Sequence, residues 1–375
     1  MKKTIVWIIV LILVVWGISA LVKKNSAPAL TGPIKIGFIG PLTGDAASYG
    51  EPIKNSVALA VNEINKAGGV GGQQIQMIYE DGKCTGTDAA SAAQKLVNVD
   101  QVKYIIGGMC SGEVFSEIPI TSKAQVFVIS PSASAAKLSG ISEYFVRNNP
   151  SDSLTGGALA NYVVKSYKTA AIISEQTDFA QGIRDNFISE AEKGGLKIVD
   201  TEDFKTDTTD FRSLLSKIKT QNPDVLFINP QTPQNAIRIA QQARQLGLKS
   251  QFVAALFGSD PTLAAAGTAT EGMVFADLAG LSTAKGQDFL SKYKATYNSD
   301  PNYPFYDGAA YDAVYLISQA VSSVGDDSTK VQKYIHSLAN YTGVLGTYSF
   351  DKNGDIIGAG IVLEKIVGGK LVNVQ

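Results

Sequence analysis

From residue 34 onward, the chain alternates between short apolar runs and longer segments with apolar residues at helical spacing. Uninterrupted apolar runs are typical of strands buried on both faces, and a period near 3.6 residues is typical of helices that pack on a sheet. The first part of the chain predicts strands at 34–39, 74–79, 102–106 and 126–129, and helices at 49–67, 88–99 and 112–124. This regular alternation predicts right-handed βαβ units around a mostly parallel sheet.

The same pattern begins again after Pro150. Its predicted helices are 154–166, 180–193, 211–221 and 233–246, and its predicted strands are 169–173, 197–201, 225–228 and 252–255. Further helices at 286–297, 306–324 and 328–338 and a closing pair of strands at 346–350 and 361–367 complete the chain. The repeat predicts a second α/β unit of similar size.

The segment 351–355, between the closing strands, resembles half of a calcium-binding loop. Ile356 stands where such a loop needs glycine, and Val362 stands where it needs glutamate. Asn353-Gly354 is instead a strong signal for a tight turn between antiparallel strands. We therefore predict a hairpin turn and no calcium site.

Residues 1–33 are expected to direct the chain out of the cytoplasm. Lys2-Lys3 precede an apolar run at 5–22, which is long for a signal peptide and close to the minimum for a membrane-spanning helix. Ala27-Pro28-Ala29 offers a cleavage site, so a cleaved signal and an uncleaved anchor both stay open. No cysteine follows the run, which argues against a lipid-modified N-terminus, and 25–33 is expected to be a polar linker.

Composition excludes several classes of function. The formal net charge of −1 and the lack of a basic stripe argue against nucleic-acid binding. His336 is the one histidine of the 375 residues, which excludes a Ser-His-Asp triad and multi-histidine zinc sites. The dinucleotide, Walker and Gly-x-Ser-x-Gly motifs are also missing. We expect a protein that is not an enzyme and needs neither metal nor cofactor.

Cys110-Ser111 is the most informative position in the chain. It follows the predicted strand 102–106 and stands where a helix should begin. Backbone amides at a helix start, together with a serine hydroxyl, suit a carboxylate or another anion. Export would permit a disulfide between Cys110 and Cys84, the only other cysteine, worth about 3–4 kcal/mol in the loop-entropy picture. Two free thiols are the alternative.

Short motifs follow one another in a fixed order along the chain. They lie at 36–44, 49–50 and 59–70, at Cys84 and Cys110-Ser111, and at 129–134, 271–273 and 311–314. Each is weak alone, but their order and spacing resemble the type I periplasmic binding proteins, and among these the Leu/Ile/Val-binding subfamily. The resemblance spans essentially residue 34 to the C-terminus.

The resemblance implies two doubly wound, parallel-sheet α/β lobes that are joined by three crossovers and close on a ligand by hinge motion. Lobe 1 would comprise 34–150 and 277–346, and lobe 2 would comprise 151–276 and 347–375. Binding at the carboxyl ends of parallel strands is also what this fold favours.

Four candidate ligand-binding residues lie in lobe 1. By resemblance, Ser111 and Ser134 hold the ligand α-carboxylate, Ala133 contributes backbone contacts, and Tyr49 is an aromatic residue on the first loop at the cleft rim. Ser111 and Ser134 each follow a predicted strand, so both are expected at one edge of one sheet. A plain helix cap remains the alternative for Ser111, and an ordinary serine-rich loop remains the alternative for Ser134. The resemblance also pairs Cys84 with Cys110 as the lobe 1 disulfide.

Lobe 2 departs from the pattern of the subfamily. Phe179 stands where a tyrosine is expected, Gln231 or Thr232 occupies a second tyrosine position, and the glutamate that pairs with the ligand ammonium falls near Leu256-Phe257, where no carboxylate occurs. Asp260 is the nearest replacement, with Asp178 and Glu113 as others. A buried ammonium without a partner costs several kcal/mol, so either one of these acids substitutes or the ligand has no α-amino group.

The expected function is capture of a small carboxylate, most simply a branched-chain or other apolar amino acid, for an ABC importer. The protein would act as a monomer, partner a membrane permease and lie in the periplasm or on the extracellular face of the cytoplasmic membrane, with 5–22 as a conceivable tether. A ligand-sensing module for a membrane signalling partner is the alternative, as is a binder of amides, urea or carboxylates without an amino group.

Overall fold

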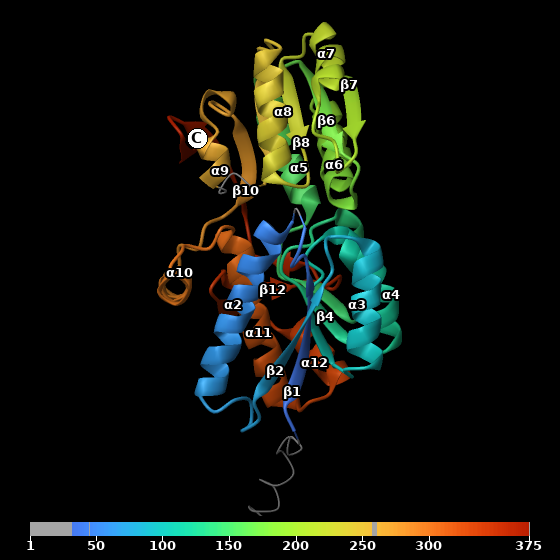
Figure 1. The fold of residues 1–375 in the computed structure, drawn as a ribbon, viewed down its shortest axis with the longest axis vertical. Coiled ribbons are helices and arrows are strands. Elements are labelled where there is room, and N and C mark those ends of the chain that lie inside the picture. Colours follow the sequence, from blue (N-terminus) through green and yellow to red (C-terminus); the bar gives the residue numbers. More distant parts are fainter. Residues whose placement is uncertain (1–31, 45, 257–260, 375) are drawn as a thin grey trace, which may run out of the picture.

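The computed structural model describes residues 32–44, 46–256 and 261–374. Two α/β lobes lie one above the other along the long axis of the molecule (Figure 1). The chain passes between them after β5, after β10 and after β13. The predicted fold class, with two doubly wound lobes and three crossovers, is confirmed. The predicted run at 5–22 lies outside the described residues.

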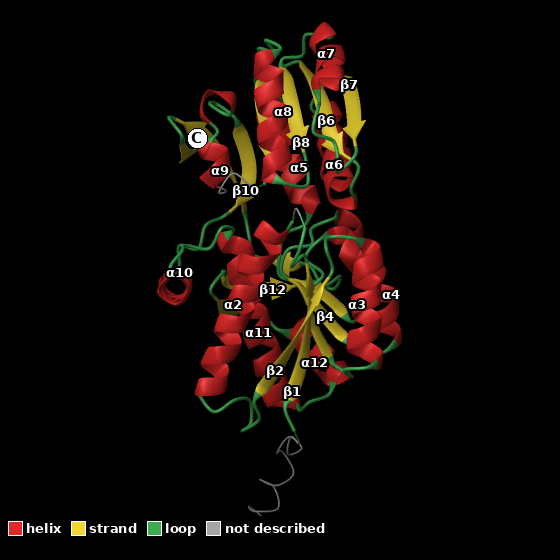
Figure 2. Cartoon of the chain, in the orientation of Figure 1, coloured by secondary structure: helices red, strands yellow, loops and turns green. Residues whose placement is uncertain are grey.

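Lobe 1 is built on a five-stranded parallel sheet in the order β2-β1-β3-β4-β5. Its strands are β1 (Ile34–Gly40), β2 (Ile75–Asp81), β3 (Tyr104–Ile106), β4 (Phe127–Ser130) and β5 (Phe145–Arg147). Its helices are α2 (Ala47–Lys66), α3 (Gly86–Asn98), α4 (Ser111–Lys123), α10 (Ala284–Tyr297), α11 (Pro304–Val324) and α12 (Ser328–Ser337), with the 3₁₀ turn η1 (Ala136–Leu138). Helices α2 and α11 pack together, as do α3 and α4, so the sheet is covered on both faces (Figure 2).

Lobe 2 is built on a seven-stranded sheet in the order β15-β14-β10-β9-β8-β6-β7. The strands are β6 (Thr169–Glu175), β7 (Lys197–Phe204), β8 (Val225–Asn229), β9 (Gln251–Ala255) and β10 (Val274–Leu278), then β14 (Ile361–Val367) and β15 (Lys370–Asn373). The helices are α5 (Asp152–Val163), α6 (Asp178–Lys193), α7 (Arg212–Thr220), α8 (Pro233–Gln245) and α9 (Pro261–Ala265), with the 3₁₀ turn η2 (Gly267–Ala269). Only β14 and β15 run antiparallel to their neighbours.

A small antiparallel sheet, β11-β12-β13, carries the last part of lobe 1. It comprises β11 (Tyr341–Gly343), β12 (Gly346–Phe350) and β13 (Ile356–Ile357). The predicted pairing of 346–350 with 361–367 is wrong, because β12 pairs with β11 and β13 while β14 pairs with β10 and β15. The predicted hairpin turn is confirmed between β12 and β13, where the amide of Gly354 donates to the carbonyl of Asp351.

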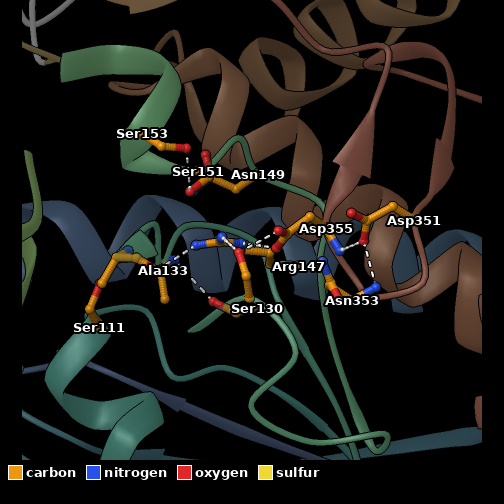
Figure 3. Close-up of polar contacts among 12 residues, drawn as sticks. Ser111, Ser130, Ala133, Arg147, Asn149, Ser151, Ser153, Asp351, Asn353 and Asp355 are labelled. Carbon is orange, nitrogen blue, oxygen red and sulfur yellow. Dashed lines mark hydrogen bonds and ion pairs between the residues drawn. The ribbon is translucent and has the colours of Figure 1, made fainter. Parts of the chain in front are cut away.

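The small sheet is fixed to lobe 1 by a buried ion pair. Nε of Arg147, at the end of β5, lies 2.6 Å from Oδ1 of Asp355 (Figure 3). The Arg147 side chain is fully buried, and it also donates to the carbonyl of Ala135 at 2.9 Å. Residues 346–357 therefore lie against lobe 1, whereas the division of the chain at Pro150, Asp277 and Gly346 stays a prediction.

No helix within the described residues is long and apolar enough to cross a membrane.

Candidate functional site

A cavity between the lobes collects residues from the carboxyl ends of strands in both sheets. The empty space among its lining residues, open solvent included, is about 510 Å³. It is lined by Ala46, Ser48, Tyr49, Cys84, Met109, Cys110, Ser111, Ser132, Phe179, Gln231, Thr232, Pro233, Gln234, Tyr303 and Tyr306. We call this space the inter-lobe cavity. Of the predicted ligand-binding residues, it brings together Ser111, Tyr49, Phe179, Gln231 and Thr232.

Ser111 is the first residue of α4, and Cys110 is the N-cap. The Ser111 hydroxyl does not cap its own helix: Oγ accepts a hydrogen bond from the amide of Ala135 at 3.1 Å. The plain-cap interpretation of Ser111 is therefore wrong. A serine oxygen that accepts one hydrogen bond can still donate its own proton, and the first-turn amides of a helix have no acceptor within it. Both features suit an anion.

The disulfide predicted between Cys84 and Cys110 is confirmed, with the two Cα atoms 5.3 Å apart. Both cysteines line the inter-lobe cavity. Glu113 joins the same two loops, because its carboxylate accepts from the amides of Cys84 at 2.9 Å, Met109 at 2.8 Å and Cys110 at 2.9 Å. Burial raises the pKa of Glu113 to about 7, and these amides act in the opposite direction. Disulfide and carboxylate together fix the turn that presents Ser111.

The loop after β4 lies beside this turn. The amide of Ala133 donates to Oγ of Ser130 at 3.0 Å and is already used (Figure 3). Ser132 Oγ donates to the carbonyl of Met109 at 2.8 Å and lines the cavity. Ser134 is buried and does not line the cavity, and its hydroxyl lies beside the carboxylate of Asp152. Ala133 and Ser134 thus lie directly behind the wall that Ser111 and Ser132 form.

Three tyrosines form an aromatic wall on the lobe 1 side. Tyr49 lies in the first turn of α2, not on a loop as expected, and its ring packs edge-on against Tyr303 at 5.4 Å and Tyr306 at 5.7 Å between ring centroids. Burial raises the pKa of the Tyr49 phenol, and a hydrogen bond with Ser132 acts in the opposite direction. This wall offers apolar ring surface with hydroxyl groups at its edges.

Lobe 2 contributes the opposite side of the cavity. Phe179 lies in the first turn of α6 and is only 7% exposed. Thr232 is the N-cap of α8, and the amide of Gln231 donates to Oε2 of the buried Glu175 at 2.7 Å. Gln231 is therefore held from behind by a carboxylate of its own lobe. Phe179, Gln231 and Thr232 therefore form the lobe 2 side of the cavity lining.

The acids considered as ammonium partners lie in different places. Both carboxylate oxygens of Glu113 already accept from backbone amides, so Glu113 is occupied. Asp178 is exposed at the outer end of the cleft, where its carboxylate faces Gly112 of the other lobe. Asp260 lies outside the described residues. In the described part of the chain, no group of three His, Cys, Asp or Glu side chains could hold a metal ion.

A wider outer space continues from the inter-lobe cavity toward solvent. It shares Ala46, Cys84, Cys110, Gln231 and Thr232 with the inner space and also contacts Lys83 and Asp178. Because the two spaces share walls, the outer one is the entrance to the cleft.

Several lining residues were missed by sequence reasoning. Ser132 lies in a serine-rich loop, two residues before Ser134, and the sequence does not set it apart from the other serines there. Tyr306 is the first residue of the predicted helix 306–324, and Tyr303 lies three residues before it. The aromatic cluster Tyr303-Pro304-Phe305-Tyr306 is the sequence feature that could have indicated an aromatic wall here. Met109 directly precedes Cys110 in the turn after β3, and its sequence position gives no sign that its side chain lines the cavity.

A sequence model of the family described as periplasmic binding protein matches residues 33–368. The Leu-, Ile-, Val-, Thr- and Ala-binding protein of Pseudomonas aeruginosa is 31% identical over 86% of this chain and 87% of its own length. The Leu/Ile/Val-binding protein of Escherichia coli is 27% identical over 91% of this chain and 92% of its own.

Solved structures agree. The branched-chain amino acid transporter substrate-binding protein LivJ of Streptococcus pneumoniae, in complex with isoleucine, superimposes with a TM-score of 0.81 at 29% identity, over 90% of this chain and 97% of that chain. The leucine-binding protein LivK of Thermotoga maritima gives a TM-score of 0.83 at 25% identity, over 91% and 98%. On this evidence, the chain belongs to the periplasmic binding protein family.

Proposed function

We propose that the protein is the solute receptor of an ABC importer and binds a branched-chain or similar apolar amino acid between its lobes. The observation that carries the proposal is the inter-lobe cavity, which combines the Ser111 hydroxyl at a helix start with apolar and aromatic walls from both lobes. The names of the related proteins point to the same class of ligand.

Each part of the ligand has a proposed partner. The α-carboxylate binds the Ser111 hydroxyl and the first-turn amides of α4, where the helix dipole favours negative charge. The apolar side chain packs against Met109, Phe179 and the tyrosine wall, including Tyr49. Gln231 and Thr232 close the lobe 2 side, while Ala133 and Ser134 complete the lobe 1 side when the lobes separate.

Binding would proceed by hinge closure around the three crossovers. The ligand enters through the outer space, contacts lobe 1 and is enclosed when lobe 2 closes. The closed form is then recognised by a membrane permease outside the cytoplasm. We propose that the receptor acts as a monomer.

Isothermal titration calorimetry of the purified chain, freed of ligand by unfolding and refolding, tests the proposal. Leucine, isoleucine and valine should bind with micromolar or tighter dissociation constants, and should raise the melting temperature by mass action. Lysine and glutamate, which would bury an unpaired charge, should not. Failure of all three branched-chain amino acids to bind would overturn the proposed ligand class.

A further inference from the structure

Asp307 is a fully buried carboxyl group next to the aromatic wall of Tyr49, Tyr303 and Tyr306. It lies in the first turn of α11, one residue after Tyr306. Its Oδ2 accepts a hydrogen bond from the amide of Tyr303 at 3.0 Å, and its own amide donates to the carbonyl of Tyr303 at 2.9 Å. Asp307 and Tyr303 are thus joined by two hydrogen bonds at the start of the helix.

The second oxygen of Asp307 links α11 to α2. Oδ1 accepts from the hydroxyl of the buried Ser56 at 3.4 Å. Ser56 lies about two turns along α2 from Tyr49. The negative charge of Asp307 also acts on the Tyr49 phenol. One carboxyl group therefore contacts both of the helices that carry the aromatic wall.

An acid at this position is costly. Burial raises the pKa of Asp307 to about 8, whereas the Tyr303 amide and the Ser56 hydroxyl act in the opposite direction. No cation of the described residues pairs with it. Packing alone would be served at lower cost by an apolar side chain. What the carboxyl group supplies here is an acceptor for the backbone of Tyr303.

That acceptor bears on the shape of the wall. Tyr303 is the N-cap of α11, and its amide donates to no carbonyl of the helix, so its hydrogen bond to Asp307 fixes the entry of the chain. Its ring packs 5.4 Å from Tyr49 and 6.5 Å from Tyr306 between centroids. A shift of Tyr303 would change the apolar surface offered to a large ligand side chain, while a single methyl group would lose little.

We propose that Asp307 is a positioning residue, which holds the aromatic wall in place and thereby sets the preference of the receptor for large apolar side chains over alanine. The proposal rests on the proposed function, because it concerns the side-chain end of the same ligand.

Glu63 provides the matched control, because it is another acid that joins α2 to α11. Its Oε2 accepts from the hydroxyl of Tyr315 at 2.9 Å and from that of Tyr311. Neither tyrosine lines the inter-lobe cavity. Loss of Glu63 should therefore lower stability without changing the ligand preference.

The test measures the affinities of L-leucine and L-alanine by calorimetry for the wild type, Asp307→Leu, Asp307→Asn and Glu63→Leu. Leucine at 307 branches at the same carbon as aspartate but offers no acceptor. Asparagine keeps one acceptor oxygen for the Tyr303 amide, and its NH₂ group can donate to Ser56, as a protonated Asp307 would. Asparagine is therefore the rescuing variant.

The wild type should bind leucine at least about tenfold more tightly than alanine, because leucine buries more apolar surface. Asp307→Leu should lose at least about fivefold in leucine affinity and less than about twofold in alanine affinity. Asp307→Asn should keep the wild-type preference. Glu63→Leu should have a lower melting temperature and the same preference as the wild type.

Two further variants cover a failure of Asp307→Leu to fold. Asp307→Ala removes the acceptor without adding bulk and should lose the preference in the same way. Ser56→Ala removes only the link to α2 and should reduce the preference to a smaller extent.

Four outcomes would overturn the assignment. They are a wild type without preference, a preference within about twofold of wild type in every folded variant of Asp307 and in Ser56→Ala, an equal loss in Asp307→Asn and Asp307→Leu, and an equal loss in Glu63→Leu. A wild type that binds neither amino acid would instead show that the proposed ligand class is wrong, and this proposal would fall with it.

Discussion

Glu113 and Cys84 are joined by a hydrogen bond of 2.9 Å from the Cys84 amide to Oε1 of Glu113, across 29 positions of the chain. The disulfide between Cys84 and Cys110 joins the same two loops, so these loops are linked twice at the cavity. Gly82 makes room for it, because a Cβ there would lie 2.2 Å from the same carboxylate oxygen.

Replacing Glu113 should therefore destabilise the protein. Glu113→Ala leaves the amides of Cys84, Met109 and Cys110 without their acceptor, and we expect a loss of about 3 kcal/mol or more in the free energy of unfolding. Urea unfolding of the oxidised protein measures this loss. Glu113→Gln, which retains one acceptor oxygen, should lose less than the alanine variant. Equal stability of Glu113→Ala and the wild type would show that the carboxylate does not hold the loops.

Stability should fall as pH rises from about 5 to 8. Burial raises the pKa of Glu117 to about 8, and it raises that of Asp307 to about 8. When the pH is below the ordinary pKa values of Glu and Asp, both carboxyl groups are protonated in the folded and the unfolded state. When the pH lies between the ordinary and the raised pKa values, they are protonated only in the folded state. Each group then removes up to about 1.4 kcal/mol of stability per pH unit.

Urea midpoints of the ligand-free protein at pH 5, 6, 7 and 8 test this dependence. Glu117→Gln, which is neutral in both states, should flatten it. His336 acts in the opposite sense, because burial lowers its pKa and stability is lost as pH falls below its ordinary value. A midpoint that rises from pH 5 to 8 in a His336→Gln background would contradict the prediction.

Loss of the disulfide should reduce both stability and ligand affinity. The loop-entropy relation gives about 3–4 kcal/mol for a closure of this length. Because Cys84 and Cys110 line the inter-lobe cavity, the double variant Cys84→Ser/Cys110→Ser should also bind leucine more weakly. Thiol titration of the unfolded, unreduced wild type should find no free cysteine. Unchanged leucine affinity in the double variant would mean that the disulfide does not shape the cavity.

Ser111→Ala tests the carboxylate partner. We expect at least about a tenfold loss of leucine affinity, since a hydrogen bond to a charged group disappears. The variant also loses the acceptor for the Ala135 amide, so its melting temperature must be compared with that of the wild type. Ser153→Ala, at an exposed position on α5, is the control and should bind normally. Normal leucine binding by Ser111→Ala would remove Ser111 from the site.

The main helices and strands could be predicted because their apolar periodicity is set by burial on a two-faced sheet. β5 and β10 could not. Strand β5 (Phe145–Arg147) is only three residues long and ends in a charged residue, so it shows no apolar run in the sequence. The partner of Arg147, Asp355, lies 208 positions away. Val274–Leu278 contains the buried Asp277, which breaks the apolar run.

Within the site, sequence identified residues that follow strands, because strand ends must meet at the cleft. It did not identify Tyr303. This residue belongs to lobe 1 through α11, late in the chain, and only the fold brings it to Tyr49.

The place of the disulfide in the cavity wall has a consequence for when the protein becomes active. A newly made chain in a reducing cytoplasm holds Cys84 and Cys110 as thiols, so the carboxylate of Glu113 links the two loops without help from a disulfide. Oxidation after export completes the wall. On the proposed function, the cavity would then reach its full ligand affinity only after this bond has formed.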